Sequence, residues 1–237
     1  IKYAIGASLI SVIATSSGSA VAYIKDKITN IRVGMFLEIG TTTGAITGAF
    51  LGGIITPNYL YVIFGIFLLY SAIVMLKKRH DELPENVPLH PIAKKLRLNG
   101  EYYDKALQKN VVYNADNVYG GLGVMYGAGI MSGLLGIGSG SFKVMAMDVF
   151  MKLPLKVSSA TSNFMMGVTA AASAGVYLLR GDIDPKIAAP VALGVLTGST
   201  IGARVMQNLK SKTIRKIFIP ILMYVSIQMI IKGLVGR

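Results

Sequence analysis

GTTTGAITGA, at residues 40–49, and GVLTGSTIGA, at residues 194–203, are two copies of one pattern that lie 154 residues apart. The same shift gives ten ungapped identities within 42 positions, in matching apolar segments. The identities outside the two quoted stretches pair Ser8 with Ser162, Thr15 with Thr169, Ser19 with Ser173, Ala20 with Ala174 and Tyr23 with Tyr177. Because these matches keep one register across two helix-length segments, the sequence indicates an internal repeat.

The composition places both copies in a membrane. The chain has 237 residues, of which 53% are hydrophobic and 15% charged, whereas soluble domains carry about 25% charged residues. Seven apolar segments are each long enough to cross ~30 Å of hydrocarbon at ~1.5 Å per residue: 4–24, 31–55, 57–76, 118–136, 157–179, 187–208 and 213–234. The prediction is an all-α polytopic membrane protein, which excludes most soluble enzyme folds. Without cysteine, disulfides and thiolate catalysis are also excluded.

The repeat divides the chain into three parts. Residues 1–79 form the first repeat, 80–117 a polar linker, and 118–237 the second repeat. Residues 118–156 have no counterpart, because it would precede Ile1, so we expect the N-terminal hairpin of the first repeat to be absent from this chain. Asn99-Gly100 predicts a small β-hairpin in the linker. The linker also contains both histidines, interpreted as solvated, and we expect no metal site and no cofactor.

The distribution of positive charge predicts the orientation. With the predicted segments threaded in order, the side that holds the 25–32 loop and the linker collects seventeen Lys and Arg residues, and the other side five. By the positive-inside rule the linker is cytoplasmic. The net charge of +13 is thus explained by topology, and no nucleic-acid partner is expected. In this threading the loops after Tyr23 and Tyr177 fall on opposite sides, which predicts inverted repeats, as in many secondary transporters.

A glycine-rich break at 133–140 is the first candidate site. The piece that follows, 141–153, is too short to cross the membrane and is interpreted as a half-helix. Unwound backbone at membrane depth must be satisfied by protein or water, and a helix start there offers free N–H groups to an anion. The predicted anion-binding residues are Gly138, Ser139, Gly140, Ser141 and Lys143. The alternative is a kinked helix that packs closely through its glycines.

A polar cluster at the start of the next apolar segment can face this break. Thr161, Ser162 and Asn163 are predicted to add side-chain hydrogen bonds to the anion, with Ser8 and Thr15 as the counterpart in the first repeat. The alternative is that these side chains only link neighbouring helices.

Two carboxylates fall within apolar segments. Charged groups at membrane depth are costly, so Glu38 and Asp148 are candidates for proton coupling. The alternatives are a snorkelling or ion-paired Glu38, and an Asp148 paired with Lys152 one turn later.

Glycines recur at every fourth residue in both repeats. The spacing predicts close helix packing along two ribbons, Gly40, Gly44, Gly48 and Gly52 in the first and Gly194, Gly198 and Gly202 in the second.

The second half resembles the sulfite exporter TauE/SafE family, also called the toluene sulfonate uptake permease family. The resemblance is carried by Gly136-Ile-Gly138-Ser139-Gly140-Ser141-Phe-Lys143, by Lys156 to Met165, by Val168 to Tyr177, by Gly181 to Pro185 and by the second glycine ribbon. The first half resembles the family more loosely. The family pattern reads Gly-x-Gly-Gly-Gly in the broken loop, whereas here Ser139 and Ser141 flank Gly140.

The resemblance implies a plasma-membrane transporter, in a bacterium or archaeon, for sulfur-containing oxyanions or organosulfur anions such as sulfite, thiosulfate or sulfonates. Alternating access would come from one repeat rocking against the other. The alternatives are a passive anion channel and an intramembrane serine hydrolase using Ser139 or Ser141. We expect a non-enzyme, with a small anion and the bilayer as partners, and a homodimer is compatible with the sequence.

Overall fold

The computed structural model describes residues 2–51, 57–77, 88, 90–135, 140–179, 181 and 183–235. Each of the seven predicted apolar segments contains a long helix. These helices are α1 (Lys2–Lys25), α2 (Ile31–Leu51), α3 (Pro57–Lys77), α5 (Val118–Leu135), α7 (Leu155–Leu179), α8 (Pro185–Asn208) and α9 (Ser211–Val235). Among the described residues, three helical stretches are long and apolar enough to cross a membrane: Ala7–Lys25, Pro185–Asn208 and Ser211–Val235.

The shorter elements complete the chain. They are α4 (Pro91–Lys95), strands β1 (Gly100–Asp104) and β2 (Lys109–Tyr113), α6 (Gly140–Met145) and a π-helical turn, η1 (Ala146–Phe150). The predicted half-helix after the glycine-rich break is therefore confirmed, and it starts at Gly140 and continues through η1. Except for the two-stranded hairpin, the described elements are helical, as predicted.

Local sequence signals set several helix starts. Asn30 precedes α2, and its Oδ1 accepts a hydrogen bond from the Val33 N–H at 3.1 Å. Asp184 precedes α8 in the same way, accepting from the Lys186 N–H at 2.9 Å, with Pro185 at the first helical position. These are the capping positions at which short polar side chains replace missing intrahelical acceptors.

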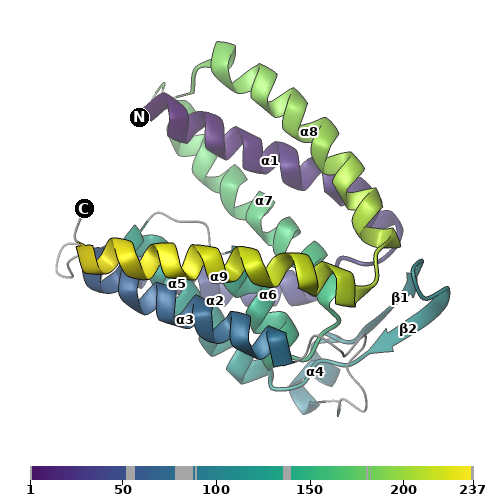
Figure 1. The fold of residues 1–237 in the computed structure, drawn as a ribbon. Coiled ribbons are helices and arrows are strands. Elements are labelled where there is room, and N and C mark those ends of the chain that lie inside the picture. Colours follow the sequence, from purple (N-terminus) through teal and green to yellow (C-terminus); the bar gives the residue numbers. More distant parts are fainter. Residues whose placement is uncertain are drawn as a thin grey trace.

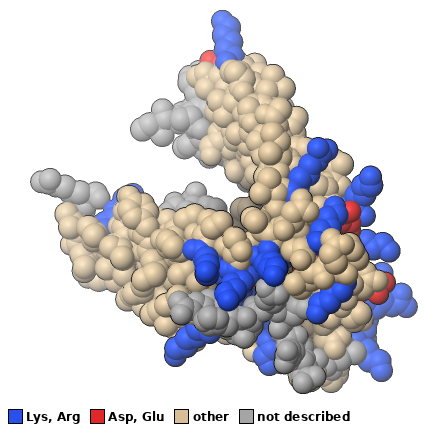
Figure 2. Space-filling model, turned by 45° about the vertical axis from the view of Figure 1, so that its right-hand side comes forward, with Lys and Arg blue, Asp and Glu red and all other residues tan. Residues whose placement is uncertain are grey.

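The helices form two groups, each drawn from both sequence halves (Figure 1). In one group α1 packs against α7 and α8, and in the other α2 packs against α5 and α3 against α9. The groups meet where α6 and α2 contact α7. They diverge toward the ends that carry the two termini, and Figure 2 shows an open notch between them.

The two glycine ribbons behave differently. A Cβ on Gly44 would overlap the Tyr126 carbonyl of α5, and one on Gly48 the Ile130 carbonyl, so the first ribbon packs closely as predicted. Gly52 lies outside the described residues. The prediction is wrong for the second ribbon, because no described atom lies within 4 Å of a Cβ placed on Gly194, Gly198 or Gly202. The helix α8 contacts α1 through its opposite face, where Gly18 meets Ser199 and Leu196.

The predicted linker hairpin exists, but its turn is misplaced in the prediction. Gly100 is the first residue of β1, and the strands are joined through residues 105–108, with Asp104 paired with Lys109. The Asp104 carboxylate accepts from the N–H groups of Ala106 at 2.9 Å and Leu107 at 3.2 Å, which stabilises this turn. Asp is a common residue in such turns because its short side chain reaches the backbone ahead of it.

The hairpin belongs to the main core. Tyr102, Val111 and Tyr113 are buried in the same hydrophobic cluster as Val33 of α2 and Val157 of α7. The hairpin therefore packs against the ends of α2 and α7.

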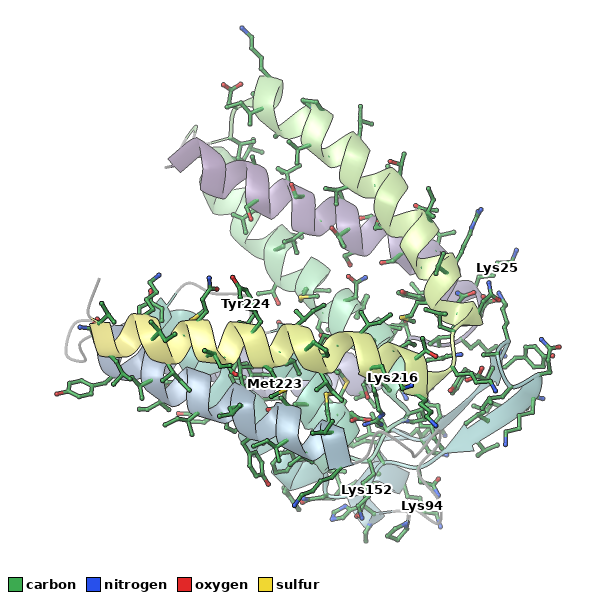
Figure 3. The ribbon with its side chains drawn as sticks, in the orientation of Figure 1. Lys25, Lys94, Lys152, Lys216, Met223 and Tyr224 are labelled. Carbon is green, nitrogen blue, oxygen red and sulfur yellow. The ribbon has the colours of Figure 1, made fainter. Side chains whose placement is uncertain are left out.

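Positive charge gathers at the hairpin end of the molecule. Figure 2 shows Lys and Arg crowded there, and in Figure 3 Lys25, Lys94, Lys152 and Lys216 all lie toward that end. The visible part of the opposite end carries few such side chains. The predicted charge asymmetry thus corresponds to one physical face of the protein.

Candidate functional site

A cluster of three side chains lies where the two helix groups meet. Lys143 Nζ, from α6, is 3.1 Å from Glu38 Oε2 of α2. Thr169, on α7, donates from Oγ1 to Glu38 Oε1 at 2.6 Å and accepts from Lys143 Nζ at 3.3 Å. Three elements from both sequence halves therefore converge on one charged site, which we call the Lys143–Glu38–Thr169 cluster.

The members of this cluster differ in exposure. The Lys143 side chain is 1% exposed and that of Glu38 13%, while Thr169 is an exposed residue of α7. An ammonium at membrane depth requires a counter-charge, and Glu38 supplies it. From the sequence we expected Lys143 to give the site a positive charge, but the Lys143–Glu38 pair has no net charge. The ion-paired interpretation of Glu38 is confirmed, and its role in proton coupling stays a prediction.

The residues of the glycine-rich break are placed only in part. Gly138 and Ser139 lie outside the described residues. Gly140 begins α6, and its carbonyl accepts from Ser162 Oγ of α7 at 3.0 Å. Ser141 follows, half-buried, two residues before Lys143 on the same short helix. Of the predicted anion ligands, the structure therefore brings Gly140, Ser141, Lys143 and Ser162 into one region.

Each side chain of the polar cluster on α7 bonds a different element. Besides the Ser162 contact with α6, Thr161 Oγ1 accepts from the Asn30 N–H at 3.0 Å, which holds the start of α2. Asn163 Nδ2 donates to Ser19 Oγ of α1. The predicted alternative, hydrogen bonding between helices, is confirmed for these three residues. Any contact with an anion stays a prediction.

The first-repeat counterparts are not hydrogen-bonded to the charged cluster in the described structure. Ser8 is exposed on α1, and Thr15 Oγ1 donates to the Ser11 carbonyl of its own helix at 2.8 Å. Neither makes a hydrogen bond to Lys143 or Glu38 within the described part of the chain. The repeat did contain the relevant signal, because Thr15 corresponds to Thr169 under the shift of 154.

Asp148 is held by a partner that local spacing could not reveal. Its two oxygens accept from Arg215 of α9 at 2.6 and 3.0 Å, with side chains 1% and 5% exposed. The predicted Asp148–Lys152 pair is wrong, since Lys152 Nζ lies 2.8 Å from Asp116 instead. The π-helical turn and the break after it direct the two side chains apart. A bidentate guanidinium makes Asp148 a structural anchor.

A second buried ion pair joins the hairpin to the membrane helices. Lys156 Nζ of α7 lies 2.7 Å from Asp104 Oδ1 and donates to the Gln207 carbonyl of α8 at 3.0 Å, with both charged side chains 1% exposed. Tyr102 donates to Asp104 at 3.2 Å. Burial and the neighbouring Asp104 raise the pKa of Tyr102 well above its usual range, so its hydroxyl remains a donor.

A basic cavity lies apart from the cluster, at the hairpin end of α1 and α8. It measures about 400 Å³ and is lined by Lys25, Asp26, Lys105 and Arg204, among others. Lys105 is paired with Asp26 at 2.7 Å. Arg204 was not among the residues predicted from the sequence. It lies within the apolar helix α8, where a charged side chain is rare and therefore indicates a functional role.

Comparison with known proteins identifies the family of this chain. A family model for the sulfite exporter TauE/SafE matches residues 1–229. The chain belongs to the TauE/SafE family. Two relatives of this TauE/SafE protein come from Bacillus subtilis strain 168. The probable membrane transporter protein YunE is 30% identical over 98% of this chain and 82% of its own length. The probable membrane transporter protein YdhB is 24% identical over 91% and 79%.

No solved structure matches this TauE/SafE chain. The family resemblance seen in the sequence is confirmed, and the chain is a multi-pass membrane protein of a transporter family.

Proposed function

We propose that this TauE/SafE protein is a secondary transporter for sulfur-containing oxyanions or organosulfur anions, working by alternating access in the plasma membrane of a bacterium or archaeon. The observation that carries the proposal is the buried Lys143 ammonium beside the start of the broken helix, at the junction of the two helix groups. A fixed cation in a low-dielectric site is what a transported anion requires.

The helix arrangement supports alternating access. Under the shift of 154, α1, α2 and α3 correspond to α7, α8 and α9, and both α1–α7 and α3–α9 are contacting pairs. Helices of each pair run in opposite directions (Figure 1). Inverted repeats produce this pairing, and the site then lies at the junction that rocking would open to each side in turn. We infer that the basic, hairpin-bearing end faces the cytoplasm.

The hydrolase alternative gains nothing from the geometry. A serine–lysine pair would need the ammonium directed at a serine hydroxyl, but the bonds that Lys143 Nζ makes in the described structure go to Glu38 and Thr169. A passive channel differs from a transporter in kinetics, so it becomes an outcome of the flux measurement below.

Thermal unfolding in detergent tests anion binding at this site. We expect one or more anions from a panel of sulfite, thiosulfate, sulfoacetate, taurine, sulfate and chloride to raise the midpoint, because a ligand at 100 Kd stabilises the folded state by about 2.7 kcal/mol. Lys143→Met should abolish the rise. The matched control is Lys109→Met, which removes an exposed lysine from β2 and should leave the rise intact.

Two results would contradict the assignment. If the rise persists in Lys143→Met and disappears in Arg204→Gln, the anion binds the basic cavity between α1 and α8. If no anion in the panel shifts the folded wild-type protein, the proposed cargo class is wrong.

A further inference from the structure

The two carboxylates at membrane depth are bound in different ways, and the difference suggests which one moves a proton. Both Asp148 oxygens accept from the guanidinium of Arg215, whose protons are permanent, and the Asp148 side chain is 1% exposed. Glu38 accepts from Lys143 through one oxygen at the longer distance of 3.1 Å, and its side chain is 13% exposed. Of these two carboxylates, Glu38 is the one with a single charged contact and a partly exposed side chain.

Thr169 can serve Glu38 in either protonation state. Its hydroxyl has one hydrogen and two acceptors within reach, Glu38 Oε1 at 2.6 Å and the Met165 carbonyl at 2.8 Å. With Glu38 ionised, Thr169 donates to the carboxylate. With Glu38 protonated, the acid donates to Thr169, which then donates to Met165. The heavy atoms need not move, so proton uptake by Glu38 breaks no hydrogen bond at this position.

Charge balance then links the proton to the anion. Lys143 is 1% exposed, and an anion bound to it beside an ionised Glu38 would bury one more negative charge than the same anion beside a protonated Glu38. We propose that Glu38 is the proton-coupling residue: anion and carboxylate compete for Lys143, and Glu38 takes a proton from water as the anion replaces it. This inference rests on the proposed function and adds proton–anion symport, one proton for each anion bound.

Other titratable groups near the cluster are accounted for. The charged side chains on the elements packed against α2 and α6 are Lys156, which is paired with Asp104, Asp148, which is paired with Arg215, and Lys77 at the end of α3. The elements also carry Tyr59, Tyr61, Tyr70, Tyr119, Tyr126 and Tyr177, and α2 itself carries Arg32 at its start. None of these side chains is the ion-pair partner of Lys143 in the described structure; that partner is Glu38.

The test measures the affinity of the detergent-purified chain for thiosulfate as a function of pH. Thiosulfate is the dianion of a strong acid, so its own charge stays constant over the neutral range. If the anion and the Glu38 carboxylate compete for Lys143, thiosulfate affinity falls as pH rises. Once Glu38 is ionised, the apparent Kd should increase by up to about tenfold for each pH unit. Glu38→Gln should bind with equal affinity across the range, near the low-pH affinity of the wild type. Glu101→Gln, an exposed carboxylate change on β1, should keep the wild-type slope.

Calorimetry in buffers of different ionisation enthalpy gives an independent readout. At the alkaline end we expect the wild type to take up close to one proton per thiosulfate bound, and Glu38→Gln to take up none. Thr169→Val should shift the pH midpoint and Thr169→Ser should restore it, since only the serine keeps the hydroxyl.

The outcomes separate this inference from the proposed function. If thiosulfate binds and Glu38→Gln keeps the wild-type pH slope and proton uptake, Glu38 is not the coupling residue, although anion binding stands. If neither thiosulfate nor any other anion of the panel binds the folded wild type at any pH, the transport proposal fails and the coupling fails with it.

Discussion

At the scale of single residues, the charged groups inside the bundle divide into fixed and exchangeable pairs. Asp148 and Arg215 share two short hydrogen bonds in a buried setting. Lys143 and Glu38 share one longer contact next to the exposed Thr169. In the proposed mechanism the Asp148–Arg215 pair holds η1 to α9, and the Lys143–Glu38 pair changes partners when the anion binds.

Breaking the fixed pair should therefore unfold the protein more readily than breaking a surface pair. Asp148→Asn leaves the buried Arg215 without its counter-charge, and we expect a loss of about 3–5 kcal/mol in the free energy of unfolding. Asp116→Asn removes the partly exposed partner of the exposed Lys152 and should cost ~0–1 kcal/mol. Denaturant unfolding in one detergent measures both. Equal losses would show that the Asp148–Arg215 pair is not a structural anchor.

The sequence revealed these charged residues but not their partners. Glu38, Lys143 and Asp148 are recognisable because charges within apolar segments are rare. Their partners lie 105 and 67 residues away, at Glu38–Lys143 and Asp148–Arg215. Local spacing favoured Lys152 as the partner of Asp148. That spacing assumes a continuous α-helix, but the π-helical turn ends at Phe150, before Lys152.

At the scale of elements, apolar length predicted the helices well, whereas glycine spacing predicted close packing correctly for the first ribbon and wrongly for the second. All seven predicted segments contain a long helix among the described residues, and the half-helix begins at Gly140. The hairpin turn was misplaced because Asn99-Gly100 is a statistical preference, whereas the Asp104 carboxylate forms actual hydrogen bonds that fix the turn five residues later.

The two glycine ribbons make a matched pair for a packing experiment. Gly44→Leu would drive a side chain into the Tyr126 carbonyl of α5, and overpacking of this kind costs about 1–3 kcal/mol or more. Gly198→Leu places the same side chain where no described atom lies within 4 Å. We expect a lower thermal unfolding midpoint for Gly44→Leu and an unchanged midpoint for Gly198→Leu.

A large loss in Gly198→Leu, equal to that of Gly44→Leu, would contradict the account of α8 given above. It would mean that the outer face of α8 is covered in the purified protein by another helix or a second copy.

At the scale of the whole molecule, function depends on the way the two sequence halves combine. Neither half supplies a complete helix group: α1 packs with α7 and α8, while α2 and α3 pack with α5 and α9. The Lys143–Glu38–Thr169 cluster lies at the junction of the groups, and the linker hairpin closes the basic end through Lys156 and Asp104. Any rocking of the groups against each other would reshape the surroundings of Lys143 first.

The most direct test of this account is thiosulfate uptake into proteoliposomes with an inward-directed proton gradient. We predict saturable uptake that accumulates thiosulfate above its external concentration, is lost in Lys143→Met and is retained in Lys109→Met. Uptake that rises linearly with concentration and stops at equilibrium would identify a passive channel. Uptake that is equal in Lys143→Met and the wild type would contradict the central claim that the buried ammonium binds the transported anion.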